Sequence, residues 1–264
     1  MDDSTSIKKI SLKRVDQYLV DLKKAKSRTY AQELIKAGHV FLKTIHEAVQ
    51  IIKPSLLLTA EQAENLLVTQ LEKKFVSRSG HKLDHAIDEL KLLCKDKVVL
   101  DIGQSTGGFT DCLLQQQAKL VYGVDVGHDQ LDQTLKNHPK VRFFEGINAR
   151  NLFEFISQNP QIDDRIDMVV MDVSFISIGL IVPQIEKILS KGGLLLSLVK
   201  PQFELSPSHL NKKGIVKSSK SYAEVEKKTK SFFAKNQWTI HNYLSSQLPG
   251  KDGNHEFFIF VEKK

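Results

Sequence analysis

The sequence predicts an α/β protein with a mostly parallel seven-stranded sheet, preceded by a smaller basic block. From about residue 97 onward, short β-branched runs alternate with helical patterns, which is typical of parallel sheets covered by helices. Before about residue 60, apolar residues instead repeat at helical spacing among many lysines and arginines. We therefore divide the chain into a first domain at residues 1–60, a linker at 61–75 and a second domain at 76–264.

The composition is that of a globular protein, with 264 residues of which 41% are hydrophobic and 26% are charged. No apolar run approaches the roughly 20 residues that a membrane-spanning helix needs. The charged N-terminal stretch MDDSTSIKKI lacks the apolar core of a secretory signal, so we expect a cytoplasmic protein with no membrane partner. Cys94 and Cys112 fit structural thiols, and no Cys or His cluster has metal-ligand spacing, so no metal is expected.

The basic block carries most of the excess positive charge of the chain. Residues 11–45 contain eight lysines and arginines against three acidic residues, and their apolar pattern predicts two short helices. Since the basic residues fall mostly between the apolar ones, they share an exposed surface. That surface is either a solvated charged face or one that binds nucleic-acid phosphates. The best candidates for phosphate binding are Arg14, Lys24, Lys26 and Arg28.

Seven strands follow the basic block. We expect them at residues 97–102, 120–125, 141–144, 166–172, 194–199, 238–244 and 256–261, with a helix at 222–235 before the last two. Ligands of such sheets bind beyond the carboxyl ends of the strands. Gly103, Asp125, Asp172 and Lys200 all stand at such ends.

The stretch LDIGQSTGGFTD, residues 100–111, forms a glycine-rich loop between the first strand and the next helix. Its glycines match neither the G-x-G-x-x-G pattern of dinucleotide-binding loops nor the G-K-[ST] ending of phosphate-binding loops. Asp101 and Asp125 would repel phosphates but suit hydroxyl groups and cations. S-adenosylmethionine, which has a ribose and a positive charge but no phosphate, fits this loop better. A purely structural turn and another nucleotide cofactor are the alternatives.

In this interpretation, Asp125 accepts hydrogen bonds from the ribose hydroxyls, and Asp101 contacts the ammonium end of the cofactor. The backbone amides of residues 105–108, near a helix N-terminus, bind the methionine carboxylate.

A second group of candidates carries charge near the same sheet edge. Asp172 ends the fourth strand in MDVSFIS, and Lys200 ends the fifth in LVKPQFE. A lysine after an apolar strand is typical of a solvated strand end, but its position near Asp172 favours a functional role. Lys82 falls in the first turn of the helix expected in VSRSGHKLDHAIDEL, where a cation opposes the helix dipole. Glu256 begins the last strand in GNHEFFIF.

Together these motifs resemble the TlyA family of ribosomal RNA 2′-O-ribose methyltransferases, whose members are often called hemolysins. The resemblance spans residues 13–258 and rests on RVDQYLV, KSRTYAQELIKAGHV, VSRSGHKLDHAI, LDIGQSTGGFTDCLL, VYGVDVGHDQL, DVSFIS, LVKPQFE, KKGIVKS and GNHEFF. It implies an α+β S4-like RNA-binding domain followed by a Rossmann-like methyltransferase domain of the FtsJ/RrmJ type. It also implies S-adenosylmethionine as cofactor and cytidine in the ribosomal RNA of ribosomal subunits as substrate.

The resemblance maps a catalytic Lys-Asp-Lys-Glu tetrad onto Lys82, Asp172, Lys200 and Glu256. With the loop, it gives this cofactor-binding set: Asp101, Gly103, Ser105, Thr106, Gly107, Gly108, Phe109, Asp125, Val126, Asn148 and Asp172. The expected reaction moves a methyl group from the sulfonium to a ribose 2′-hydroxyl, with Lys200 as general base when it is neutral.

The sequence departs from the family pattern in three places. The family has SRGGxKL where this chain has Ser79 and His81 around Gly80, and ERTNxR where it has EGINAR. Gln104 stands where the family usually has alanine. These departures leave Gln104, Gly146 and Ile147 without an assigned role. Three other functions stay open: a non-catalytic ribosome-assembly factor, a membrane-lytic protein, and a methyltransferase acting on transfer RNA or a small molecule.

Overall fold

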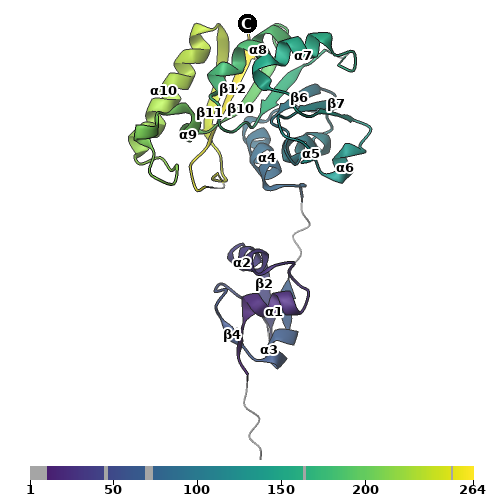
Figure 1. The fold of residues 1–264 in the computed structure, drawn as a ribbon, viewed down its shortest axis with the longest axis vertical. Helices are drawn as coiled ribbons and strands as arrows, with labels where there is room; N and C mark the ends of the chain where they lie inside the picture. Colours follow the sequence, from purple (N-terminus) through teal and green to yellow (C-terminus); the bar gives the residue numbers. More distant parts are fainter. Residues whose placement is uncertain (1–10, 45–46, 69–73, 163–164, 251) are drawn as a thin grey trace, which may run out of the picture. The chain divides into compact units, whose positions relative to one another are not determined.

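The structure, a computed structural model, describes residues 11–44, 47–68, 74–162, 165–250 and 252–264. The chain divides into two compact units, Met1–Lys74 and Phe75–Lys264. Figure 1 shows the helices and strands of each unit, which we describe separately.

The first unit combines short helices with two small antiparallel sheets. In one sheet β1 (Lys13–Arg14) pairs with β4 (Leu57–Leu58), and the other has the strand order β3-β2-β5. The remaining strands are β2 (Val40–Lys43), β3 (Ala48–Gln50) and β5 (Leu66–Val68). The helices are α1 (Val15–Asp21), α2 (Arg28–Lys36) and α3 (Ala60–Glu64). Ser27 caps α2 by accepting a hydrogen bond from the Tyr30 amide, which satisfies a backbone donor at the start of the helix.

The core of the first unit extends into the segment that the sequence predicts as a linker. Ala63 of α3 and Leu66 of β5 are buried with Leu19 and Leu34 in one hydrophobic cluster. Residues 61–68 therefore belong to the fold of the first unit, while residues 69–73 of the expected linker lie outside the described residues. The apolar pattern of the sequence does not reveal that this segment is part of the core, because α3 is so short that it contributes a single buried residue, Ala63.

The second unit is built on a seven-stranded sheet with the order β11-β12-β10-β9-β6-β7-β8, so the mostly parallel sheet that the sequence predicts is confirmed. β12 runs in the direction opposite to the other six strands of this sheet, which are parallel to one another. The strands are β6 (Val98–Ile102), β7 (Leu120–Val124), β8 (Val141–Phe144), β9 (Met168–Met171), β10 (Leu194–Val199), β11 (Trp238–Ser245) and β12 (Phe257–Lys263).

Helices cover both faces of this sheet (Figure 1). On one face α4 (Arg78–Leu90) and α5 (Gly108–Gln115) share a hydrophobic cluster with the strands. On the other face the packed helices are α7 (Leu152–Gln158), α8 (Val182–Ile188) and α10 (Ser219–Lys235). All five residues of β6 are buried, because a strand covered on both faces has no solvent side. The shorter α-helices are α6 (Gln133–Lys136) and α9 (Pro201–Glu204). Three short 3₁₀-helices are labelled η1 (Ala149–Asn151), η2 (Ile178–Leu180) and η3 (Pro207–His209).

Candidate active site

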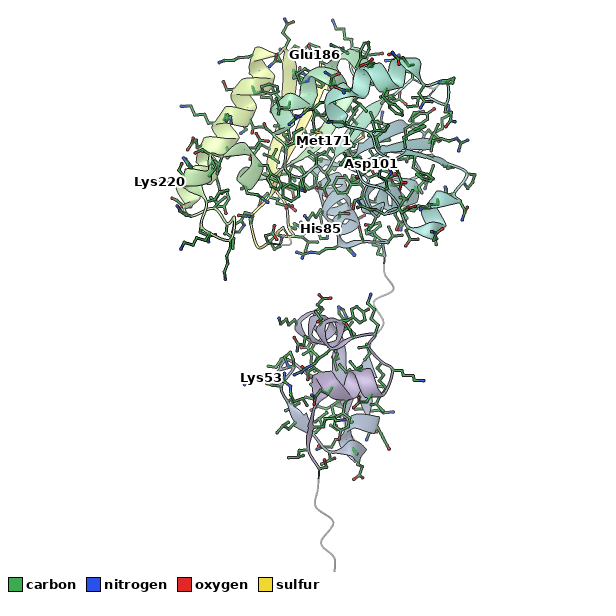
Figure 2. The ribbon with its side chains drawn as sticks, in the orientation of Figure 1. Lys53, His85, Asp101, Met171, Glu186 and Lys220 are labelled. Carbon is green, nitrogen blue, oxygen red and sulfur yellow. The ribbon has the colours of Figure 1, made fainter. Side chains whose placement is uncertain are left out.

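Two adjoining cavities lie where the parallel strands of the second unit end. Their volumes are about 350 Å³ and about 530 Å³, and we call them the first and the second cavity. Figure 2 labels Asp101 and Met171 on the neighbouring strands β6 and β9, whose ends lead into this region. Both cavities are lined by the loops after these strands, at Gly103, Ser105, Asp172, Ser174 and Phe175.

All four residues of the predicted tetrad line the first cavity. Lys82 Nζ donates a hydrogen bond to Glu256 Oε2 over 2.5 Å. Lys200 Nζ lies 2.6 Å from Asp172 Oδ1. No side chain of the four is more than 16% exposed, so two nearly buried ion pairs face one space. The fold thus brings together, at one cavity, residues that are up to 174 positions apart in sequence.

Local structure places each lysine at the first cavity. Pro201 begins α9 directly after Lys200, so the apolar strand β10 ends at this lysine. Ser174 accepts a hydrogen bond from Lys200 Nζ over 2.9 Å, a contact that the sequence does not reveal. Lys82 lies on α4, whose beginning packs tightly on that of α5. A Cβ atom on Gly80 would lie only 2.8 Å from the Gly108 carbonyl oxygen.

The three glycines of the loop are required by contacts within the protein. Gly103 has a φ of +83°, and a Cβ atom there would lie 2.4 Å from the Asp172 carbonyl oxygen. A Cβ on Gly107, whose φ is +91°, would meet Leu135, and one on Gly108 would meet Ser79. Neither Gly107 nor Gly108 is among the described residues that line the two cavities. The close approach that these glycines predict is therefore an approach of the chain to itself.

Two of the loop amides expected to bind a carboxylate have partners inside the protein. The Ser105 amide donates to Asp125 Oδ2 over 2.8 Å, and the Gly107 amide donates to the Gln104 carbonyl over 2.8 Å. Ser105, Thr106 and Phe109, three of the predicted cofactor-binding residues, line the first cavity. The expected capture of a carboxylate by all the amides of residues 105–108 is thus not what the structure shows.

Asp101 is fully buried and, within the described residues, lines neither cavity, so the expected contact with a ligand is not visible. Burial raises the pKa of this carboxyl to about 7; a hydrogen bond from Thr110 opposes the rise and the charge of Asp172 adds to it. Thr110 Oγ1 donates to Asp101 Oδ2 over 2.7 Å. Oδ1 is buried without a hydrogen-bond partner in the described part of the chain.

Gln104, which the sequence leaves without a role, supports Asp101 from behind. Its side chain is buried, and its Nε2 donates to Thr110 Oγ1 over 2.8 Å. Since the Thr110 hydroxyl in turn donates to Asp101, the three side chains form one hydrogen-bonded chain. Gly123 on β7 leaves room for it: a Cβ atom there would lie 2.0 Å from the Gln104 side chain.

The second cavity is lined by Asp125, Val126 and Asn148, three of the predicted cofactor-binding residues. Asp125 follows β7 and accepts hydrogen bonds from the amides of Ser105 and Gly127. Ile147 provides part of the apolar wall, a role that the departure from the family motif obscures. Gly146 lies outside the lining and occupies a turn with a φ of +73°.

Phe175 is the most conspicuous lining residue that the sequence does not predict. It lines both cavities, its side chain is 90% exposed, and its φ of +63° is unusual for an aromatic residue. Its ring lies 5.1 Å from that of Phe203, measured between centroids. Glu204 accepts hydrogen bonds from the Ser177 hydroxyl and the Ile178 amide and so ties this loop to α9. The motif DVSFIS could have indicated Phe175 as a lining residue, because this aromatic residue follows Asp172 by three positions.

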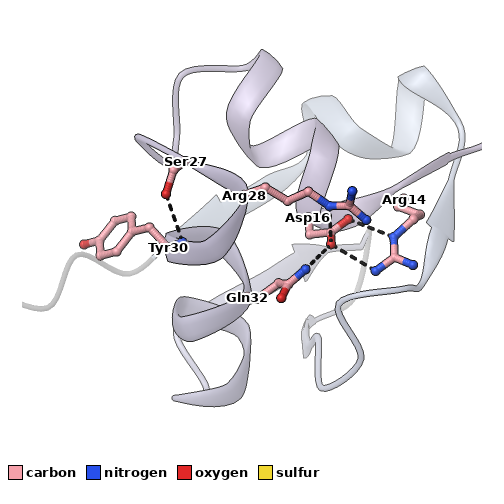
Figure 3. A network of polar contacts seen from close by, with 6 residues as sticks. All are labelled: Arg14, Asp16, Ser27, Arg28, Tyr30 and Gln32. Atoms are coloured by element: carbon pink, nitrogen blue, oxygen red, sulfur yellow. Dashed lines mark hydrogen bonds and ion pairs between the residues drawn. The ribbon is translucent and has the colours of Figure 1, made fainter. Parts of the chain in front are cut away.

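In the first unit, two of the predicted RNA-binding residues share one buried carboxylate (Figure 3). Arg14 and Arg28 each bind Asp16 Oδ2 over 3.0 Å, and Gln32 Nε2 donates to the same oxygen over 2.8 Å. Burial alone would raise the pKa of Asp16, but the hydrogen bonds from Arg14, Gln32 and Arg28 hold it well below its ordinary value. The arginine side chains stay 37% and 50% exposed, so both also face solvent.

The two predicted lysines of the first unit make other contacts. Lys24 donates to the carbonyl of Leu66, and Lys26 lies over the ring of Tyr30 at 5.1 Å from its centroid. The structure therefore joins Arg14 and Arg28 in one cluster and gives the two lysines separate environments.

Comparison with known proteins assigns both units. The family model for FtsJ-like methyltransferases matches residues 75–263, and the S4 domain model matches residues 13–42. The chain belongs to the FtsJ-like methyltransferase family. Its first unit carries an S4 domain.

Relatives of this FtsJ-like chain include proteins named for ribosomal RNA modification. It is 35% identical over 253 residues to the Mycobacterium tuberculosis protein named 16S/23S rRNA (cytidine-2′-O)-methyltransferase TlyA, covering 94% of this chain and 89% of the relative. The Campylobacter jejuni 23S rRNA (cytidine-2′-O)-methyltransferase TlyA is 31% identical over 224 residues, covering 84% and 83%. Hemolysin A of Brachyspira hyodysenteriae is 36% identical over 244 residues, covering 92% and 97%. The resemblance to the TlyA family that the motifs predict is confirmed.

A solved structure agrees over nearly the whole FtsJ-like chain. A protein from Streptococcus thermophilus, described as a candidate hemolysin, has a TM-score of 0.70 and 33% sequence identity, covering 97% of this chain and 90% of that one. None of the helices in the described ranges is long and apolar enough to cross a membrane. Within the same ranges, no three His, Cys, Asp or Glu side chains are grouped so as to hold a metal ion.

Proposed function

We propose that this protein transfers a methyl group from S-adenosylmethionine to the 2′-hydroxyl of a cytidine ribose in ribosomal RNA. The observation that carries this proposal is the presence of two nearly buried ion pairs, Lys82–Glu256 and Lys200–Asp172, that face one cavity beside a second cavity lined by Asp125. The names of the TlyA relatives support ribosomal RNA as the substrate, with ribosomal subunits in the cytoplasm as partners.

The second cavity fits the adenosine part of S-adenosylmethionine. Its volume of about 530 Å³ lies within the roughly 300–1,000 Å³ of small-molecule sites. Asp125 places a carboxylate at the end of β7, where it would accept hydrogen bonds from the ribose hydroxyls. Val126, Ile147 and Ile176 offer apolar contacts to the adenine, and Asn148 offers polar ones. The other proposed cofactor contacts are Gly103, Ser105, Thr106, Phe109 and Asp172.

Three predicted cofactor residues act in this proposal through the shape and charge of the loop. Gly107 and Gly108 let the loop pack closely on α6 and α4. Asp101 Oδ1 is buried and has no hydrogen-bond partner among the described residues, which suits a neighbouring cation such as the ammonium group of S-adenosylmethionine. The bound cofactor supplies a methyl group on a positively charged sulfur.

The residues of the first cavity prepare the ribose hydroxyl. Lys200 first releases a proton to solvent, and its neutral amine then takes the proton of the 2′-hydroxyl as the oxygen attacks the methyl group. Asp172, 2.6 Å away, stabilises the ammonium group that this transfer forms on Lys200. Ser174 fixes the position of the same nitrogen. Lys82, held by Glu256, offers a positive charge to the oxygen as it becomes more negative.

In this proposal the first unit supplies affinity for the RNA substrate. The side chains of Arg14 and Arg28 are partly exposed, and a guanidinium group carries five N–H donors. The donors that do not bind Asp16 are therefore available to phosphate oxygens. Lys24 and Lys26 add positive charge to the same domain. Contacts of this kind position an RNA without reading its sequence.

The test is to incubate the full-length protein with isotope-labelled S-adenosylmethionine and ribosomal subunits that lack the modification. We expect label in ribosomal RNA as 2′-O-methylcytidine. Lys200→Ala should abolish the transfer while the cofactor still binds, as measured by calorimetry. A wild-type protein that binds the cofactor and the subunits but leaves no label would instead be a non-catalytic assembly factor. Full activity of Lys200→Ala would exclude Lys200 as the base.

A further inference from the structure

The segment that runs from the end of α9 into the first turn of α10 carries a concentration of positive charge that the proposed reaction does not use. Residues 206–220 include four exposed lysines and no acidic residue. The lysines of this segment, which we call the lysine loop, are Lys212, Lys213, Lys217 and Lys220. Figure 2 labels Lys220 where the loop enters α10.

The lysine loop has a defined shape. Leu210 and Val216 form an isolated antiparallel bridge, and Gly214 turns the chain between them with a φ of +73°. Asn211 Oδ1 accepts hydrogen bonds from the amides of Lys213 and Ile215. Lys212 and Lys213 therefore stand at the tip of an ordered turn, from which they project into solvent.

The lysine loop is fastened to the segment that carries Glu256. Asn254 is 1% exposed, and its Oδ1 accepts a hydrogen bond from the Val216 amide over 3.0 Å. Its Nδ2 donates to the Gly214 carbonyl, also over 3.0 Å. Asn254 lies two residues before Glu256, which lines the first cavity, so the base of the lysine loop is joined to a segment that reaches this cavity.

The first cavity itself offers no excess positive charge to an RNA strand. Lys82 and Lys200 are each paired with a carboxylate. Among its other described lining residues, the charges of Arg78 and Asp252 oppose each other. A ribose in RNA has a phosphate on each side, and binding these phosphates requires cations close to the site. Among the described residues, the lysine loop is a basic segment tied through Asn254 to the chain that carries Glu256.

We propose that the lysine loop binds backbone phosphates of the ribosomal RNA strand next to the target ribose. This surface on the methyltransferase unit would add to the one on the S4 domain, and it rests on the proposed function. Exposed lysines act as point charges without fixed geometry, so the loop would attract the strand without selecting its sequence.

The test compares two full-length double variants with the same change of charge. Lys212→Glu with Lys213→Glu alters the tip of the lysine loop. Lys191→Glu with Lys235→Glu alters exposed residues near the other end of the strands, where β10 and β11 begin and β12 ends. For both we would measure kcat and KM on unmodified ribosomal subunits over a range of salt concentrations, together with the Kd for S-adenosylmethionine.

For the loop variant we expect a KM at least tenfold above that of the control, with kcat and cofactor Kd within twofold of wild type. The slope of log KM against log salt should fall by about one for each phosphate that the variant no longer binds. Lys212→Arg with Lys213→Arg should keep a KM near wild type, since it keeps the charge. A loop variant that matches the control overturns the proposal, and so does a fall in kcat alone, which would indicate a structural role beside Glu256. If the wild type does not methylate the subunits, the proposed function fails, and co-sedimentation of both variants with subunits still decides whether the lysine loop binds RNA.

Discussion

Arg14 and Arg28 bind the same oxygen of a single buried carboxylate, Asp16 Oδ2, each over 3.0 Å. The two arginines are the strongest candidates for phosphate contacts in the first unit, and their positions are fixed by this shared partner. Reversing the charge of either one would therefore damage the fold of the S4 domain as well as any RNA contact. Substituting Asp16 is the sharper way to examine the cluster.

Asp16→Asn should destabilise the first unit. The amide keeps the size of the side chain but removes the charge that both guanidinium groups bind, so we expect a loss of about 1–3 kcal/mol. This loss of stability is measured by urea unfolding of the full-length protein, monitored with a spectroscopic probe placed in the first unit. Asp21→Asn breaks the exposed pair with Lys13 and should leave that transition unchanged. If the two substitutions lowered the stability equally, the buried position of Asp16 would not be what makes its ion pairs stabilising.

The first unit should also lose stability in acid. The pKa of Asp16 is lower in the folded protein than its ordinary value of 3.8, so its contribution is fully present above that value. It is lost as the pH falls below 3.8 toward the folded pKa. Unfolding measured between pH 6 and pH 2.5 should show this loss in the wild type and less of it in Asp16→Asn. Parallel profiles for the two proteins would speak against it.

Asp101 should have the opposite dependence on pH. Its pKa is raised to about 7 in the folded state, so the folded protein keeps a proton that the unfolded chain releases. Its contribution to stability is most favourable below pH 3.8 and declines until about pH 7. Relative to wild type, Asp101→Asn should therefore be more stable at pH 8 than at pH 5 in urea unfolding. Asp129→Asn, at a highly exposed carboxylate, serves as the control and should show no such difference.

Gly123→Ala should destabilise the second unit through Gln104. The added methyl group would overlap the Gln104 side chain, and relieving such overpacking typically costs about 1–3 kcal/mol. Gln104→Ala should restore part of this loss when combined with Gly123→Ala, because it removes the atoms that collide. A double-mutant cycle in urea tests the coupling. Strictly additive effects would show that the two side chains do not compete for space.

Glu204→Ala should slow methyl transfer more than it weakens cofactor binding. The substitution removes both acceptors that hold Ser177 and Ile178, and with them the loop that carries Phe175 and Ser174. Glu204→Gln keeps one oxygen acceptor and should have the smaller effect. We expect a tenfold or greater fall in kcat for the alanine variant. Unchanged kcat in both variants would mean that this loop keeps its shape without Glu204.

The sequence was sufficient to predict the sheet, and it named the four residues of the candidate tetrad, whose catalytic role stays a prediction. Strands such as β6 and β10 are apolar along most of their length because both faces are covered, and such runs are easily recognised. Lys200 and Asp172 could be named because each directly follows such a strand. The end of the first unit could not be predicted from the sequence. Ala63 and Leu66 give too weak an apolar pattern to show that they join the hydrophobic core of this unit.

What the sequence by itself determined is which residues end strands, begin helices or require a glycine. What only the tertiary structure decided is what those residues meet. The loop glycines pack against Asp172, Leu135 and Ser79. Gln104 reaches Asp101 through Thr110, and Lys82 pairs with Glu256 across 174 positions. The physical reason is that periodicity and spacing report whether a residue is buried, whereas its partner depends on the order of strands in the sheet and on which helices close over it.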